Sequence, residues 1–129
     1  MIARALTVDG VYDVDLDAEE VVEHDPAGTM EPAPRPEVGL PRVVAAAAAG
    51  ATVVAVVDAR PPLLVSHDAG ATWSASGRGL PAGFAVAVAE ENPDVVVFAA
   101  RNRLYLSRDG GRFWSPLPLE LPDVLALEI

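Results

Sequence analysis

The 129 residues suffice for one domain with a real core, because half of them are hydrophobic. The net charge is −10, all nine cationic residues are arginines and cysteine is absent, which excludes disulfide bridges and thiolate metal sites and disfavours nucleic acid as a partner. The sequence has neither a run of 18 apolar residues nor an apolar leader segment, so we expect no membrane contact and a cytoplasmic location.

Residues 1–25 are typical of three short strands in succession. In Val11–Leu16 apolar side chains alternate with aspartates, which is the period of a strand with one buried face. Ile2–Val8 precedes this segment and Val21–His24 follows it, each across a turn. The sequence therefore predicts a three-stranded unit at its start.

Five prolines interrupt residues 26–41, and we expect a linker there, because proline lacks the N–H group of the backbone and fixes φ. The next segment, Arg42–Ala49, ends in five consecutive alanines, whose intrinsic propensity favours a helix. Thr52–Asp58 follows it with the apolar run of a buried strand. A crowded inner position suits small side chains, so we predict a strand at Arg42–Ala49 rather than a helix.

A short motif separates the predicted strands Leu63–Ser66 and Thr72–Ser76. It reads Ser-His-Asp-Ala-Gly-Ala-Thr-Trp. An aspartate that enters a tight turn accepts hydrogen bonds from the backbone N–H groups that follow, and a glycine two places later allows a positive φ. A tryptophan that leaves the turn can bury about 150–250 Å² against a neighbouring sheet. We expect these positions to stabilise the fold: Ser66, Asp68, Gly70, Thr72 and Trp73.

The same motif returns 41 residues later. Its matching positions are Ser107, Asp109, Gly111 and Trp114, with Phe113 in place of the threonine. The strands around it repeat as well, and they are expected at Phe84–Ala89, Val95–Ala100, Leu104–Ser107 and Phe113–Leu117. Repeats of about 40–45 residues with four strands each are typical of propeller blades.

Both motifs resemble the Asp-box, or BNR repeat, Ser-x-Asp-x-Gly-x-Thr-Trp, of sialidases, sortilin-type receptors and photosystem-assembly propellers. The resemblance implies that each box is the turn between the third and fourth strands of a blade, and that it marks architecture rather than an active site. We therefore expect an all-β propeller of four-stranded antiparallel blades. One blade spans 42–81, one spans 82–122, residues 1–25 form a partial blade without its first strand, and residues 123–129 form a lone innermost strand.

Three blades are too few to close a ring, because propellers typically have four to eight. We predict a homodimer with six blades, in which residues 123–129 of each chain complete the N-terminal blade of the other.

The sequence offers little for catalysis or metal binding. Sialidases need converging arginines, a tyrosine nucleophile with a glutamate and an Arg-Ile-Pro motif, whereas this chain has two tyrosines and no such motif. The acidic residues between Asp13 and Glu20 lack the glycine and glutamate spacing of a calcium loop. The two histidines, His24 and His67, lie far apart in the sequence. We expect no catalytic residue, no metal and no cofactor.

The function that we expect is a non-catalytic scaffold or adaptor that binds another protein. The alternative is a module that binds a small molecule or carbohydrate, including a relative of the sialidase-like glycosidases. In that alternative Arg101 and Arg103, in a turn between two strands, would contact the ligand.

Overall fold

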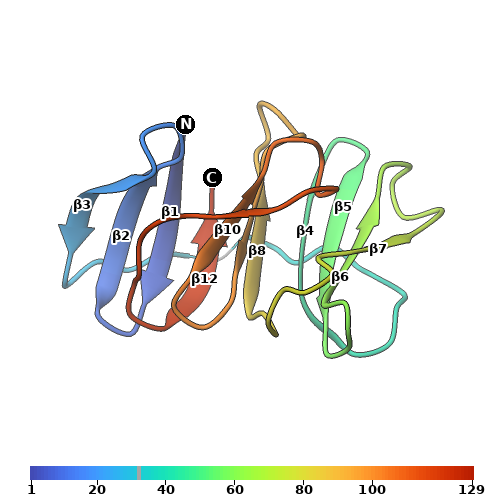
Figure 1. Ribbon diagram of the computed structural model, residues 1–129, viewed down its shortest axis with the longest axis horizontal. Coiled ribbons are helices and arrows are strands. Elements are labelled where there is room, and N and C mark those ends of the chain that lie inside the picture. Colours follow the sequence, from blue (N-terminus) through green and yellow to red (C-terminus); the bar gives the residue numbers. More distant parts are fainter. Residues whose placement is uncertain (32) are drawn as a thin grey trace.

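The computed structural model describes residues 1–31 and 33–129 (Figure 1). In this part of the chain twelve strands form three four-stranded antiparallel sheets, and none of it is helical. The predicted all-β architecture of propeller-type blades is confirmed. Blade 1 has the strand order β12(Val124–Glu128), β1(Ile2–Thr7), β2(Gly10–Asp15) and β3(Glu20–Asp25). Blade 2 comprises β4(Val43–Ala49), β5(Thr52–Val57), β6(Leu63–Ser66) and β7(Ser74–Ser76). Blade 3 comprises β8(Ala85–Val88), β9(Val96–Ala99), β10(Leu104–Ser107) and β11(Ser115–Pro116).

Blade 1 obtains its innermost strand from the other end of the same chain. Strand β12 pairs antiparallel with β1, and Arg4 lies opposite Glu128 (Figure 1). The strand pairing predicted between two chains is thus made within one chain, because the segment that leaves blade 3 runs directly beside β1. This pairing does not test the homodimer, which stays a prediction.

The alanine-rich segment forms β4, the innermost strand of blade 2. Its register places Ala45 opposite Val56 and Ala47 opposite Val54. These small side chains face blade 3, as do Val54 and Val56 of β5, which are fully buried. Packing between sheets therefore overrides the helix propensity of alanine at this position.

Blade 3 lies between the other two blades and shares a core with each of them. Its inner strand β8 contacts β12 on one side and β4 on the other (Figure 1). One core joins blades 1 and 3 through side chains such as Val14 and Leu104, and the other joins blades 2 and 3 through Phe98 and Leu63. The three blades form an arc in the order blade 2, blade 3, blade 1.

The outermost strands differ in length. Strands β7 and β11 have three and two residues, and each begins after the tryptophan of its box rather than before it. The expected earlier starts at Thr72 and Phe113 fail because their N–H groups bond to an aspartate of the box instead of a neighbouring strand. Strand β3 has six residues, all exposed.

The described parts of the proline-rich linker, residues 26–31 and 33–41, lie across the open side of the arc between β3 and β4 (Figure 1). Gly28 lies against the side chain of Val11, and the Arg35 guanidinium donates a 3.1 Å hydrogen bond to the Val43 carbonyl. In the described residues no helix has the length and apolar character needed to cross a membrane.

Candidate functional site

The first box is a closed network of hydrogen bonds around Asp68. The Ser66 hydroxyl donates to Asp68 Oδ1 at 2.7 Å and accepts the Gly70 N–H at 2.8 Å. The Thr72 hydroxyl donates to Asp68 Oδ2 at 2.5 Å, and the Thr72 N–H donates to Oδ1 at 2.8 Å. These bonds from Thr72, with the one from Ser66, lower the pKa of Asp68 to about 2. Both oxygens of the Asp68 carboxylate thus accept hydrogen bonds from within the turn.

The second box keeps this network without the threonine. Ser107 bonds to Asp109 at 2.8 Å and accepts the Gly111 N–H at 2.9 Å, while the Phe113 N–H donates to Asp109 at 3.0 Å. Partial burial raises the pKa of Asp109, but the bonds from Phe113 and Ser107 outweigh it and leave the pKa below its ordinary value. Phe113 is 78% exposed, so this departure from the motif removes one hydroxyl group and leaves the turn intact.

The backbone explains the glycine of each box. Gly70 has a φ of 90° and Gly111 a φ of 89°, the left-handed region that the motif predicted. The preceding residues, Ala69 and Gly110, are also left-handed, with φ values of 58° and 75°. Sequence reasoning did not identify this second left-handed position, for which the glycine at 110 was the available signal.

The second residue of each box joins its blade to the next one. His67 Nε2 lies 2.9 Å from the Gly110 carbonyl oxygen and so links blade 2 to blade 3. Arg108 donates to the Leu16 carbonyl at 2.9 Å and to Asp17 at 3.2 Å, and so links blade 3 to blade 1. The motif allows any residue at this second position. Its contacts depend on the neighbouring blade, so the motif alone does not predict them.

The two tryptophans, equivalent in sequence, have different surroundings. Trp114 Nε1 donates to the Ser76 hydroxyl of blade 2 at 3.0 Å and to the Gly111 carbonyl at 3.1 Å, and its ring meets Phe98 edge-on. The Ser76 hydroxyl in turn donates to the Gly111 carbonyl. Trp73 is half-buried beside Gly70 of its own box, and its indole N–H bonds to none of the described residues. The expected plug between sheets is therefore formed at Trp114.

The arginines of the alternative hypothesis form ion pairs. Arg101 Nε lies 3.2 Å from Asp123, and an Arg103 nitrogen lies 2.9 Å from Glu120. Both pairs tie the turn between β9 and β10 to the segment that leads into β12. The two guanidinium groups thus serve that connection and do not converge on a common hollow.

The acidic residues near the N-terminus also have structural partners. Asp13 pairs with Arg4 at 3.0 Å, Asp15 accepts two N–H groups of the turn after β2, and Asp17 binds the N-terminal amine at 3.0 Å. Within the described ranges no group of three or more His, Cys, Asp or Glu side chains is placed to hold a metal ion.

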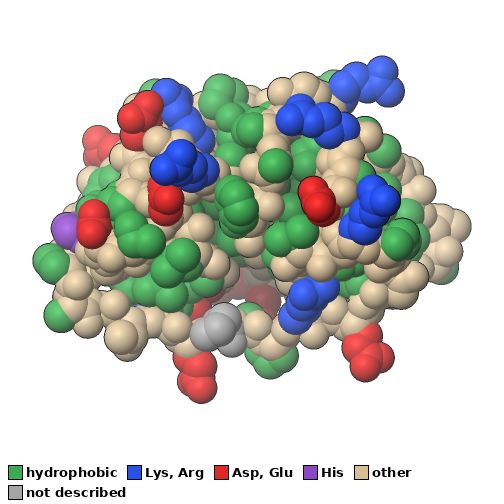
Figure 2. All heavy atoms as spheres, turned by 90° about the horizontal axis from the view of Figure 1, so that it is seen from below, with side chains coloured by type: hydrophobic (Ala, Val, Ile, Leu, Met, Phe, Trp, Pro, Cys, Tyr) green, Lys and Arg blue, Asp and Glu red, His purple; other side chains and the backbone are tan. Residues whose placement is uncertain are grey.

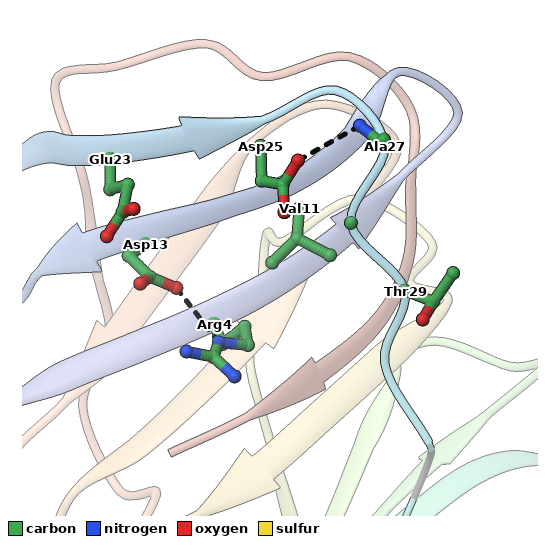
Figure 3. Close-up of a pocket in the computed structure, with 8 residues that line it drawn as sticks. Arg4, Val11, Asp13, Glu23, Asp25, Ala27 and Thr29 are labelled. Carbon is green, nitrogen blue, oxygen red and sulfur yellow. Dashed lines mark hydrogen bonds and ion pairs between the residues drawn. The ribbon is translucent and has the colours of Figure 1, made fainter.

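The face of blade 1 that points away from blade 3 carries a charged cavity of about 380 Å³ (Figure 3). Arg4, Asp13, Glu23 and Asp25 line it, together with Val11 and the first linker residues. In Figure 3 Arg4 points toward Asp13. Arg4 is the one cationic residue that lines the cavity, and it forms an ion pair with Asp13. The remaining carboxylates give this end of the arc a negative surface.

The charge of the protein is concentrated on blade 1. Residues 1–25 and 123–129 contain ten of the 19 acidic residues and only one arginine, whereas residues 26–81 contain four of each. The view from below shows more carboxylates on the blade 1 side than on the blade 2 side, with arginines on both (Figure 2). The two ends of the arc are therefore electrostatically unlike.

Comparison with known proteins supports the fold. No protein-family model matches the chain. A search of curated proteins likewise finds no match. Among solved structures the chain is similar to the GH74 enzyme of Niastella koreensis, a propeller-type glycoside hydrolase, with a TM-score of 0.50 and 24% sequence identity. The match covers 63% of this chain and 13% of the GH74 chain, so it spans a small part of that enzyme.

Proposed function

We propose that this chain is a non-catalytic scaffold of the Asp-box propeller type that binds another protein. The proposal rests on one observation: the polar side chains that the sequence suggested as candidates for function form structural contacts instead. Asp68 and Asp109 hold turns, Arg108 joins two blades, and Arg101 and Arg103 hold a connection. These groups serve the fold, which leaves the outer surface to carry the activity.

Strand β3 is the part of that surface best suited to a protein partner. It is an edge strand of six exposed residues, whereas the corresponding edges β7 and β11 have only three and two. Val21 and Val22 are 39% and 52% exposed there, between acidic neighbours. An exposed edge offers unpaired backbone groups to an added strand, and the charge of blade 1 favours a basic partner and repels a second β3.

The test is affinity capture from the source cells with the parent chain and two variants. In Glu19→Lys/Glu20→Lys the charge at the start of β3 is inverted, and in Glu90→Lys/Glu91→Lys the same change is made in the turn between β8 and β9. We expect the first variant to lose, and the second to keep, a basic protein whose purified form binds the parent directly. Equal capture by all three chains would contradict a role for β3.

A second measurement tests the alternative that the chain binds or hydrolyses a carbohydrate. We retain this alternative because the structural neighbour is a GH74 enzyme. Oligosaccharides and small anions are screened for a shift in the melting temperature and for hydrolysis. We expect neither effect, and reproducible hydrolysis by the pure chain would overturn the proposal. The cytoplasmic location stays a prediction, which fractionation of the source cells would test.

A further inference from the structure

The arc ends in two faces, one on blade 2 and one on blade 1, that no neighbouring blade covers. The contact between blades 2 and 3 shows how two adjacent blades pack against each other. Trp114 of blade 3 donates to Ser76, on the outermost strand of blade 2. A side chain at Gly111 would touch Val65, so the second box lies directly on blade 2. Each box is therefore built to rest on the blade that precedes it.

The first box has no preceding blade. Leu63 and Val65 point toward blade 3, and since side chains alternate along a strand, Leu64 and its cross-strand partner Ala75 point to the opposite, outer face. Trp73 stands at the corner of this face in the place that Trp114 occupies on blade 3. Its indole N–H lacks the hydroxyl acceptor that Ser76 provides to Trp114, as far as the described residues show.

The linker leaves this corner open. Its contact on blade 2, from Arg35 to Val43, lies at the start of β4. The first box lies at the other end of the sheet, where the Ala69 N–H bonds to the Ala51 carbonyl. The segment that crosses the open side thus does not replace the missing blade at Trp73.

The opposite end of the arc, on blade 1, carries charged side chains. On blade 1 Ala3 and Val14 face blade 3, so Arg4, Asp13 and Glu23, which share a row across the sheet, face outward. Glu23 lies on the outermost strand and faces away from blade 3. It thus occupies the position on blade 1 that corresponds to Ser76 on blade 2, where Ser76 faces Trp114 of the following blade. Contact between two copies of blade 1 would bring like charges together, whereas contact of blade 1 with blade 2 would not.

We propose that the outer face of blade 2 receives blade 1 of a second copy, so that two arcs close a six-bladed ring. Each β12 stays in its own chain, and the interface repeats the contact of blade 3 on blade 2. The Trp73 indole donates to the carboxylate of Glu23 from the partner copy. Two-fold closure covers both end faces of each chain at once. The proposal goes beyond the scaffold function and does not depend on which other protein is bound.

The first test measures association with matched variants of β7. Light scattering during size-exclusion chromatography should give twice the chain mass for the parent. Ala75→Glu places a charge on the outer face, and we expect it to raise the concentration needed for association by about tenfold or more. Ser74→Glu, one residue earlier on the other face of the strand, is the control and should associate as the parent does. Circular dichroism verifies that both variants fold. A monomeric parent over the whole concentration range would overturn the proposal.

The second test uses the absence of native cysteine. Ala75→Cys, Glu23→Cys and the double variant are treated with a short bismaleimide. Head-to-tail closure predicts covalent dimers for the double variant alone. Dimers from Ala75→Cys by itself would indicate contact between two copies of blade 2, and dimers from Glu23→Cys by itself contact between two copies of blade 1, and either result would refute the arrangement.

Discussion

The contact between Gly83 and Phe98 offers a sharp test of the core between blades 2 and 3. A Cβ atom added at Gly83 would lie 1.8 Å from Phe98 Cε1 and 2.1 Å from Cζ. The Phe98 ring is fully buried, so it cannot swing into solvent to relieve the clash. We therefore expect Gly83→Ala to destabilise the protein although it adds a single methyl group.

The magnitude follows from two opposing effects. Overpacking of a core costs about 1–3 kcal/mol, and the lower chain entropy of alanine in the unfolded state offsets up to about 1 kcal/mol of that cost. The free energy of unfolding should thus fall by about 1–2 kcal/mol. Gly39→Ala is the control, because a Cβ at Gly39 meets nothing within 4 Å and the variant should be as stable as the parent or slightly more stable.

A double-mutant cycle identifies the cause. Phe98→Leu removes the two ring atoms that clash and should by itself cost about 1–2 kcal/mol through the space it leaves. In Gly83→Ala/Phe98→Leu the new methyl group occupies part of that space, so the double variant should be more stable than the sum predicts by about 1 kcal/mol. Urea unfolding of the four chains measures the cycle. Additive effects, or a Gly83→Ala variant as stable as the parent, would refute the packing.

Three further expectations concern the boxes. Trp114→Ala should lower the free energy of unfolding by about 3–5 kcal/mol, and Trp73→Ala by clearly less in the monomer, since only Trp114 packs against a preceding blade; equal losses in urea would contradict the different surroundings. Ser107→Ala leaves the buried Gly111 N–H without its acceptor and should cost about 1–3 kcal/mol, to be checked by thermal unfolding. Asp68 has its pKa lowered from 3.8 to about 2, so the stability that it contributes is present above about pH 4 and is lost as the pH falls toward 2. The difference in stability between the parent and Asp68→Asn should narrow over this range, and a constant difference would show that the carboxylate is not bonded in the turn.

The repeat and its alternating apolar residues were sufficient to predict the number and order of the strands. Strand periodicity is a local property, so it could be read from segments such as Val11–Leu16 without knowledge of their neighbours. The turn chemistry of Asp68 and Gly70 is also local, because their hydrogen bonds and backbone angles involve residues within a few positions. These features were predictable because each is set within one box or one strand.

The partners of the blade surfaces could not be predicted, because they depend on which sheets lie side by side. Tertiary structure alone places β12 on β1, makes His67 and Arg108 links between blades, and separates the two tryptophans into one that is packed and one at an open face. It also brings Arg101 into an ion pair with Asp123, and Arg103 into an ion pair with Glu120. A residue with the same position in the repeat thus acquires a different role according to whether a blade lies beside it, and the sequence of one repeat does not contain that information.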